Sequence, residues 1–383
     1  MSEFPAAVES PGGMGEAGCI RLFLCGDVMT GRGIDQVLPH PVEPHLFEGW
    51  ARSALDYVEL AERASGGIGR GLDYAYPWGE AIAVLERLRP QVRIVNLETA
   101  VTTCEDAQPG KGIHYRMNPD NLPCLTRPGI DCCVLANNHV LDWGRDGLRQ
   151  TLECLHSAGL RTAGAGANSQ EAAAPTVIEL AQARVLVFAF ADSTSGVPRD
   201  WAASPSRIGV NFLDEICANS ARRIAMQTAK HRLAHDIVVV SVHWGGNWGF
   251  DIGKAQRAFA HRLVDEGGAD IVYGHSSHHV KGIEVRRGKL ILYGCGDFLN
   301  DYEGISGHGD YRPDLSLMYF PEVDPATGNL CALQAVPMRI RRFRLERAQG
   351  EDVSWLRLTL DRESSKLGTR VTADDDGNLS FHW

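Results

Sequence analysis

The residues of this chain with the most chemical potential stand at the ends of five short apolar runs. They are carboxylates, amides and imidazoles, and lysine is scarce among them. The runs and the clusters after them are Ile20–Cys25 with Gly26-Asp27, Val92–Val95 with Asn96-Leu97-Glu98, Cys132–Ala136 with Asn137-Asn138-His139, Ile237–Val242 with His243-Trp244-Gly245, and Ile271–Tyr273 with Gly274-His275. Any one cluster could be a solvated loop. Five in series indicate a site, because gathered oxygen and imidazole donors suit divalent transition metals.

Three of the clusters supply candidate metal ligands with oxygen atoms. Asp27 follows a glycine in a turn from which a carboxylate can reach a cation, and Glu98 could bridge two ions with one oxygen to each. The amide oxygen of Asn138 can complete a coordination sphere without adding charge, and it leaves the neighbouring His139 free for acid catalysis. Taken singly, Asp27 could instead be a helix cap and Glu98 a surface residue.

Histidines are the candidate nitrogen ligands. His243 ends a run of nearly consecutive β-branched residues, which fixes its backbone as a ligand requires, although a satisfied core histidine is the alternative. His275, His278 and His279 belong to Gly-His-Ser-Ser-His-His, where protonated rings would repel one another, so shared metal coordination is the economical explanation. The sequence leaves open which of the last two histidines, His278 or His279, binds.

Four further residues are candidates for contact with a substrate. Arg32, Lys111 and Arg116 could hold a carboxylate or a phosphate, the arginines in a bidentate manner. Solvated loop charge is the alternative for each of them. Trp244 stands in an aromatic group near the expected rim and could form the wall of a cleft, against the commoner role of core packing.

The elements that must position these residues are strands alternating with helices. The apolar runs are short and rich in Val and Ile, as strands buried on both faces are. Apolar residues recur at three- and four-residue spacing in Pro77–Leu88, Gly147–Ala158 and Lys254–Glu266, which predicts helices. Such alternation predicts a largely parallel sheet, in which ligands bind beyond the carboxyl ends of the strands. All five polar clusters would lie at that edge.

The second half of the chain has less helix between its strands. We expect strands at Lys289–Tyr293, Leu315–Phe320 and Ala335–Leu345 that pair antiparallel in a second sheet. A helix from about Asp352 to Leu367 and a hairpin turning at residues 375–378 would close the chain. The expected organisation is a disordered tail over residues 1–18, one domain over 19–346, and a C-terminal helix and hairpin over 347–383 packed on that domain.

Composition limits the possible partners. The chain has 383 residues, of which 44% are hydrophobic and 22% charged, which is typical of a globular protein. Its net charge of −10 leaves no basic surface for nucleic acid or anionic lipid. No run reaches the length of a membrane span, and the acidic N-terminus does not read as a signal peptide, so we expect a cytoplasmic protein. The ten scattered cysteines are then expected to be reduced.

Five ordered motifs carry a resemblance to a known family. They are Gly-Asp-Val-Met-Thr-Gly-Arg-Gly (26–33), Asn-Leu-Glu-Thr (96–99), Ala-Asn-Asn-His-x-Leu-Asp-x-Gly (136–144), His-Trp-Gly (243–245) and Gly-His-x-x-His (274–278). Over residues 20–300 the chain resembles the poly-γ-glutamate capsule biosynthesis (CapA-type) family, a branch of the calcineurin-like metallophosphoesterase superfamily. The resemblance implies an α/β fold, namely a four-layer α/β/β/α sandwich of two mixed sheets with the site at one edge.

The resemblance also implies a centre of two divalent transition metal ions, Mn, Fe or Zn. Its ligands would be Asp27, Glu98, Asn138, His243, His275 and His278, and His139 would be the acid. The chain departs from the superfamily at Met29, where a histidine is usual, and at Glu98, where an aspartate is. It departs from the capsule branch at Ser276, Ser277 and Asp297.

The function that these features favour is metal-dependent hydrolysis. A metal-activated water would attack a γ-glutamyl amide or a phosphoester bond, and His139 would protonate the leaving group. The substrate would be a small or polymeric anion. The alternative is a non-catalytic accessory protein that binds a polyanionic polymer during poly-γ-glutamate capsule synthesis. The oligomeric state is left open.

Overall fold

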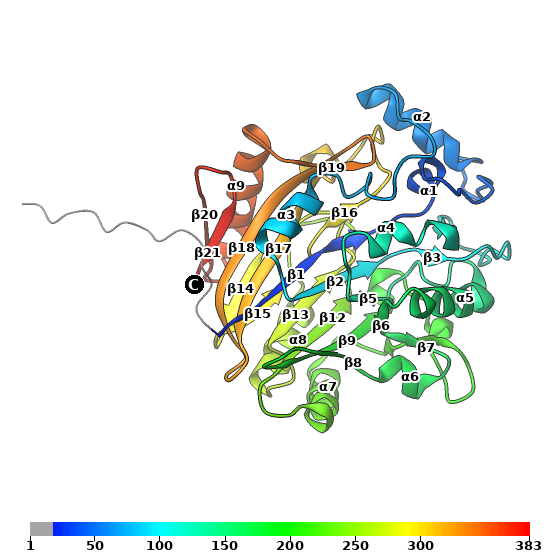
Figure 1. The fold of residues 1–383 in the computed structure, drawn as a ribbon. Coiled ribbons are helices and arrows are strands. Elements are labelled where there is room, and N and C mark those ends of the chain that lie inside the picture. The colour runs from blue at the N-terminus through cyan, green and yellow to red at the C-terminus, as the bar shows by residue number, and fades with distance from the viewer. Residues whose placement is uncertain (1–17) are drawn as a thin grey trace, which may run out of the picture.

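The protein is a mixed α/β structure with two large β-sheets that lie beside each other (Figure 1). The computed structural model describes residues 18–383, so the tail expected over residues 1–18 falls almost wholly outside the described residues. The expected α/β class with mixed sheets is confirmed, since both large sheets contain parallel and antiparallel pairs.

The first large sheet has ten strands in the described chain and holds three of the five expected strand ends. In spatial order it runs β20 (Arg370–Ala373), β21 (Leu379–His382), β18 (Asn329–Arg341), β17 (Leu315–Asp324), β1 (Ile20–Val28), β2 (Val92–Leu97), β5 (Cys132–Val134) and β6 (Arg161–Ala163), with β16 (Asp297–Leu299) beside β1 and β19 (Arg344–Arg347) beside β18. The parallel strands β1, β2 and β5 direct their carboxyl ends, and hence their polar clusters, to one edge.

The second large sheet holds the other two strand ends. Its order is β11 (Phe212–Leu213), β9 (Arg184–Asp192), β12 (Asp236–His243), β13 (Ile271–His275), β15 (Lys289–Leu292) and β14 (Ile283–Arg286), with β8 (Thr176–Glu179) beside β9. Strands β12 and β13 are parallel and in register at their ends, where His243 is paired with His275. Two small sheets pair β10 (Gly209–Val210) with β7 (Ala165–Gly166), and β3 (Ala100–Val101) with β4 (Arg116–Met117).

The helices include the three expected from apolar spacing in the first two thirds of the chain and the expected one near its end. The described α-helices are α1 (Gly33–Val37), α2 (Ala54–Ser65), α3 (Ala81–Leu88), α4 (Pro123–Thr126), α5 (Gly144–Ser157), α6 (Ser169–Ala173), α7 (Ala218–His231), α8 (Lys254–Asp265) and α9 (Glu351–Ser365). Among residues 18–383, no helix is both long and apolar enough to cross a membrane.

Alternate residues of β9 show how the second sheet is covered on both faces. Val185, Val187 and Ala189 belong to the same buried cluster as the apolar residues of β1 and β2 in the first sheet. Leu186 and Phe188, which point the other way because successive side chains alternate, belong to a cluster with residues of α7 and α8. The second sheet therefore packs against the first sheet on one face and against these two helices on the other.

The strands of the second half pair differently from the expectation in two respects. Strands β17 and β18 are antiparallel as expected, but they extend the first sheet through an antiparallel β17 to β1 pair. Strand β15 joins the second sheet parallel to β13, not antiparallel, and β16 lies parallel to β1. Strand β15 can lie parallel to β13 because the antiparallel strand β14 comes between them in the chain, within the same sheet. Strand β16 reaches β1 because the chain crosses from the second sheet to the first after β15. The C-terminal hairpin of β20 and β21 pairs with β18.

One buried tyrosine links the two sheets near the edge that carries the polar clusters. The hydroxyl group of Tyr273 on β13 accepts a hydrogen bond from the backbone N–H of Cys25 on β1 at 3.2 Å and donates one to the carbonyl oxygen of Cys25. Both residues are buried. Since Asp27 follows Cys25 by two residues and His275 follows Tyr273 by two, this bridge fixes the distance between the two strand ends.

A close backbone approach at Gly26 gives a prediction for the stability of the fold. The N–H of Asp27 donates to the carbonyl oxygen of Gly296 at 2.9 Å, and a Cβ atom on Gly26 would lie 2.0 Å from that oxygen. We expect Gly26→Ala to lower the free energy of unfolding by about 1–3 kcal/mol or more, as overpacking does, in a urea titration. Gly67→Ala, where a Cβ atom would meet nothing within 4 Å, is the matched control. Equal stability of the two variants would contradict this packing.

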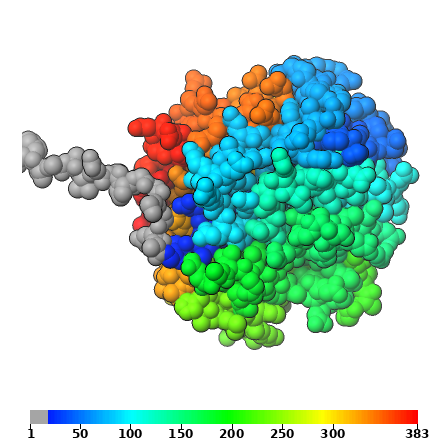
Figure 2. Space-filling view, viewed as in Figure 1, coloured from blue at the N-terminus to red at the C-terminus, as the bar shows by residue number. Residues whose placement is uncertain are grey.

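The expectation that all cysteines are reduced is wrong for one pair in the structure. Cys19, just before β1, and Cys331 on β18 form a disulfide across 312 positions of sequence. The pairing was hidden because β18 comes near the start of β1 only through the intervening β17. Figure 2 accordingly shows the blue start of the described chain on the same side as its orange and red end. The other eight cysteines are free, and five of them are buried.

Candidate metal centre

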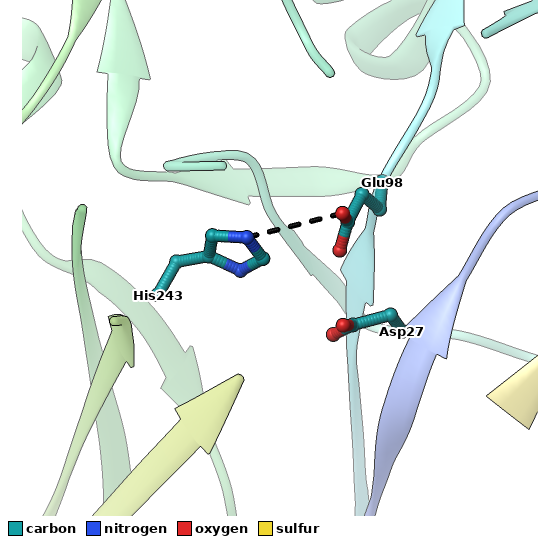
Figure 3. A group of neighbouring side chains, drawn as sticks. All are labelled: Asp27, Glu98 and His243. Carbon is teal, nitrogen blue, oxygen red and sulfur yellow. Dashed lines mark ion pairs between the residues drawn. The ribbon is translucent and has the colours of Figure 1, made fainter. Parts of the chain in front are cut away.

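Three strand ends from the two sheets bring oxygen and nitrogen ligand atoms together. Asp27 lies near the end of β1, Glu98 directly follows β2, and His243 ends β12. Their ligand atoms all lie within 4.8 Å of one another, and all three residues are buried. Figure 3 shows the three side chains pointing toward a common point, with His243 Nε2 at 3.8 Å from Glu98 Oε1.

Two asparagines hold the carboxylates of this group in place. Asn96 Nδ2 donates to Asp27 Oδ1 at 2.8 Å and to Glu98 Oε2 at 3.1 Å. Asn137 Nδ2 in turn donates to Asn96 Oδ1 at 3.0 Å. Sequence reasoning gave neither asparagine a role, although both stand inside the polar clusters, each one or two positions before a candidate ligand. Their amides supply positive hydrogen-bond dipoles without the competing charge of a lysine.

The structure places His275 and Asn138 against this group as well. His275 Nδ1 lies 2.8 Å from Asp27 Oδ1, and Asn138 Oδ1 lies 3.1 Å from His243 Nε2. The rings of His243 and His275 are nearly parallel, with centroids 6.4 Å apart. The four strand-end clusters that contain Asp27, Asn138, His243 and His275 thus lie close together, as expected. Metal binding by these residues stays a prediction.

Of the two histidines that the sequence left open, His278 faces the centre. Its Nδ1 lies 2.8 Å from Asp297 Oδ1, and Asp297 is the partner of Asp27 in the parallel pairing of β16 with β1. His279 turns away from these carboxylates: its Nδ1 lies 3.0 Å from the carbonyl oxygen of Val280. Asp297 therefore occupies a site position, and its signal in the sequence was the Gly-Asp pair that repeats the Gly-Asp of β1.

Burial makes it costly for the carboxylates of the centre to carry negative charge. The carboxylates of Asp27, Glu98 and Asp297 are all buried. Burial, and next the nearby Asp27, raise the pKa of Glu98 well above its usual range. Burial lowers the pKa of His243 to about 3, which keeps its ring neutral at neutral pH, and a neutral imidazole is the form that binds metals. A bound cation would offset the clustered negative charge.

Two buried ring nitrogens without hydrogen-bond partners in the described chain indicate whether these residues fit a metal ion. His243 Nδ1 and His275 Nε2 are buried and have no hydrogen-bond partner among the described residues. Buried polar atoms are nearly always paired, and an unpaired one calls for an explanation such as an ion. Together with carboxylate and amide oxygens they form the mixed oxygen and nitrogen donor set of divalent transition metals. The residues present therefore fit such ions.

His139 lies beside the centre in a network of its own. Its Nδ1 is 2.6 Å from Asp142 Oδ2, and its Nε2 is 3.9 Å from Glu98 Oε1. Lys111 Nζ lies 3.0 Å from the same Nδ1 and also contacts Asp142 and the carbonyl oxygen of Asn138. Burial lowers the pKa of His139 to about 4. The sequence analysis included Asp142 in the motif of residues 136–144 but gave it no role, and its signal was its place three residues after the histidine.

The two arginines expected to hold a substrate anion are engaged by the protein itself. Arg32 is buried and forms ion pairs with Asp301 and with Glu48, the latter at 2.9 Å. Arg116 donates to the carbonyl oxygen of Cys104 at 2.6 Å, and its guanidinium carbon lies 3.9 Å from the ring centroid of Trp143. Contacts of these arginines and of Lys111 with a substrate stay a prediction, and the structure shows that each of the three side chains already has partners within the protein.

Trp244 packs in the core. It is 2% exposed, donates from Nε1 to the carbonyl oxygen of Tyr293 at 3.0 Å, and stacks on that ring with centroids 6.3 Å apart. Trp248 in the same loop is the tryptophan that lies nearer the centre, since its ring centroid is 5.4 Å from that of His278. The wall that was expected at Trp244 is therefore formed by its neighbour four positions along the chain.

Comparison with known proteins identifies the family of the chain. The sequence profile described as "Bacterial capsule synthesis protein PGA_cap" matches residues 21–302, which include all the strand ends above. A Mycobacterium tuberculosis protein named "Probable polyglutamine synthesis accessory protein" is 46% identical over 367 residues, or 95% of this chain and 96% of that protein.

More distant relatives carry related names. The Bacillus subtilis "PGA biosynthesis protein CapA" is 28% identical over 72% of this chain and 62% of its own length. The Bacillus anthracis "Capsule biosynthesis protein CapA" is 27% identical over 74% of this chain and 60% of its own length. The extent of the profile match and the near full-length relative show that the chain belongs to the bacterial capsule synthesis PGA_cap family.

Proposed function

We propose that this protein is a metal-dependent hydrolase whose reaction takes place where the two sheets meet. The observation that carries the proposal is the buried group of Asp27, Glu98 and His243, with ligand atoms within 4.8 Å and with a ring nitrogen of His243 left without a partner. With Asp297 the centre holds three buried carboxylates, whose clustered negative charge raises the free energy of the folded state, and a cation that joined them and the unpaired imidazole nitrogens would offset that cost.

The fold that we propose is the four-layer α/β/β/α arrangement of metallophosphoesterases. Support comes from the shared buried cluster between the two large sheets and from α7 and α8 on the outer face of the second sheet. In such a sandwich the two sheets open at one edge, which is where β1, β2, β5, β12 and β13 end.

Two divalent ions, Mn, Fe or Zn, would be held by the six predicted residues. These are Asp27, Glu98, Asn138, His243, His275 and His278, and Asp297, whose Oδ1 lies 2.8 Å from His278 Nδ1, would orient His278. When bound, the ions would supply Lewis acidity that polarises the scissile group and lowers the pKa of a water molecule. Asn96 orients the carboxylates of Asp27 and Glu98, so its part is positional.

His139 would supply the proton for the leaving group, and because burial lowers its pKa to about 4, the charged ring that donates this proton is favoured at acidic pH. Asp142 accepts at Nδ1, so the exchangeable proton of the charged ring is on Nε2, the nitrogen that faces Glu98 and the centre. Lys111 contacts Asp142 and the backbone of Asn138, and it thereby holds the turn that carries both His139 and a candidate ligand. These contacts orient the acid before any substrate arrives.

Two classes of bond are candidates for cleavage. Relatives named for polyglutamine or PGA synthesis favour a γ-glutamyl amide, whereas the metallophosphoesterase resemblance favours a phosphoester. A screen of protein loaded with Mn, Fe or Zn should pair aryl phosphate esters with γ-glutamyl anilides. We expect turnover of one class that a chelator abolishes and added metal restores. Metal-loaded protein that hydrolyses neither class would contradict the proposal.

A non-catalytic accessory role is the second candidate, because the relative that is 46% identical carries the word "accessory" in its name. This candidate predicts saturable binding of a poly-γ-glutamate chain without turnover. The anionic nature of the substrate and the cytoplasmic location stay predictions under both candidates.

Met29 gives a prediction about unequal metal affinities. Met29 is buried, and Tyr302 Oη donates to its sulfur at 3.7 Å, on the side where Tyr302 packs against the His278 ring. A thioether binds hard ions weakly, so calorimetric titration of metal-free protein with Mn²⁺ should give two unequal affinities. Met29→His should tighten the weaker one, whereas Met226→His on the exposed face of α7 should not. Unchanged affinities in Met29→His would show that residue 29 takes no part.

A further inference from the structure

A cavity of about 550 Å³ opens beside the metal centre. Its inner end is formed by the buried side chains of His278 and Asn300, and the exposed residue Asn247 lines the cavity beside His278. Asn247 Nδ2 lies 3.0 Å from His278 Nε2, and Asn300 Nδ2 donates to Asp297 Oδ2 at 2.8 Å. A volume of this size suits a small molecule, and the shared His278 places one end of such a molecule next to the proposed reaction site.

Aromatic and apolar side chains form much of the cavity wall. Trp248 lies on it with its ring stacked on His308, the centroids 3.8 Å apart and the planes 7° from parallel. Trp50, Ile113 and Ile305, from three segments far apart in the sequence, also line it and are 59%, 40% and 43% exposed. Large apolar side chains that converge on one cavity and stay exposed are typical of a binding site.

The charges of the lining are nearly balanced, which limits the substrates that fit. Arg339 on the wall forms ion pairs with Asp314 at 3.4 Å and with Asp352 at 3.1 Å. Among the lining residues described, Arg341 is exposed and is the one arginine without an ion pair, and Glu303 adds a carboxylate. A run of carboxylates would need several free cations, so the cavity does not suit a stretch of polyanion.

We propose that this cavity binds the apolar, planar part of a small substrate that carries at most one anionic group, with that group near Arg341. The proposal rests on the proposed function, since it names the substrate class of the same site. Contact with Trp50, with Ile305 and with the stacked pair of Trp248 and His308 would hold the planar group. The hydrolysable bond would then be presented to His278 at the inner end.

Two fluorescent probes of matched shape test the cavity. They are 8-anilinonaphthalene-1-sulfonate, a planar group with one anion, and N-phenyl-1-naphthylamine, its uncharged counterpart. We expect saturable binding of both at one site. Ile305→Asp and, separately, Trp50→Ala should weaken both by about tenfold or more, because each removes apolar contact. Arg341→Ala should weaken only the sulfonate probe. Met226→Asp, at an exposed position of α7 outside the cavity lining, is the control for Ile305→Asp.

The outcomes separate this inference from the function on which it rests. His243 and His275 do not line the cavity, so a variant with alanine at both positions should still bind the probes even if it holds no metal. Absence of probe binding to metal-loaded protein would overturn the cavity proposal alone, as would unchanged affinity in both Ile305→Asp and Trp50→Ala. A competition experiment gives a further test, in which γ-glutamyl-1-naphthylamide should displace the probes at lower concentration than a γ-glutamyl oligomer does. Equal displacement by the two compounds would also overturn the proposal.

Discussion

Replacement of His139 by alanine is expected to leave the metal content unchanged and to lower kcat by about two to four orders of magnitude, as loss of general acid catalysis typically does. The reason is geometric: His139 Nε2 faces Glu98 at 3.9 Å, while Asp142 occupies Nδ1 at 2.6 Å, so the ring is oriented for proton transfer at the edge of the centre. The measurement is steady-state kinetics on the substrate class found active, with metal analysis of the same samples.

The leaving group distinguishes an acid from a merely structural residue. A substrate whose leaving group needs no proton should recover much of the rate lost in His139→Ala, whereas a collapsed site would recover none. His156→Ala, at an exposed position of α5, is the matched control and should behave as the unchanged protein does. Loss of metal from His139→Ala would show that His139 is a ligand and that its role here is wrongly assigned.

The double variant His243→Ala with His275→Ala is expected to reduce the metal content from between one and two ions per chain to none. Both unpaired ring nitrogens of the centre belong to these residues, so their removal leaves mainly oxygen donors. The unchanged protein should also gain about 2.7 kcal/mol of stability at free metal a hundredfold above the Kd, and the double variant should gain none. Elemental analysis and thermal unfolding with and without Mn²⁺ measure the two effects.

Undiminished metal content in this double variant would place the ion elsewhere in the protein. His261→Ala is a useful comparison, because His261 lies 2.8 Å from Glu284 in a polar cluster on α8 and β14 that is separate from the centre. It should alter neither the metal content nor the stabilisation by metal. A loss of metal in this control would show that histidine content in general, and not the strand ends, determines binding.

The placement of the candidate ligands could be predicted because of a simple property of parallel strands. A strand buried on both faces must end where its apolar residues end, so the polar residue that follows is placed at the sheet edge. Asp27, Glu98 and His243 obey this rule, and the structure brings their side chains together. Helices such as α8 were predictable for an equally local reason, namely the recurrence of apolar residues along one face.

Features that depend on contacts between distant segments could not be predicted in the same way. The pairing of β17 with β1 depends on which sheet edge is free, and the Cys19–Cys331 disulfide depends in turn on that pairing. The roles of Asn96 and Asp142 depend on side-chain direction within a cluster, which sequence spacing leaves undetermined. Arg32 appeared to be free for a substrate because its partners Glu48 and Asp301 lie 16 and 269 positions away.

The most direct test of the central claim is anomalous X-ray diffraction from crystals of the purified protein, recorded at the absorption edges of Mn, Fe and Zn. The claim is that the strand ends of the two sheets form one metal centre. We predict one or two anomalous peaks bounded by Asp27, Glu98 and His243, with His275 and His278 around them. Crystals of metal-loaded protein whose anomalous peaks all lie away from these residues would contradict the account.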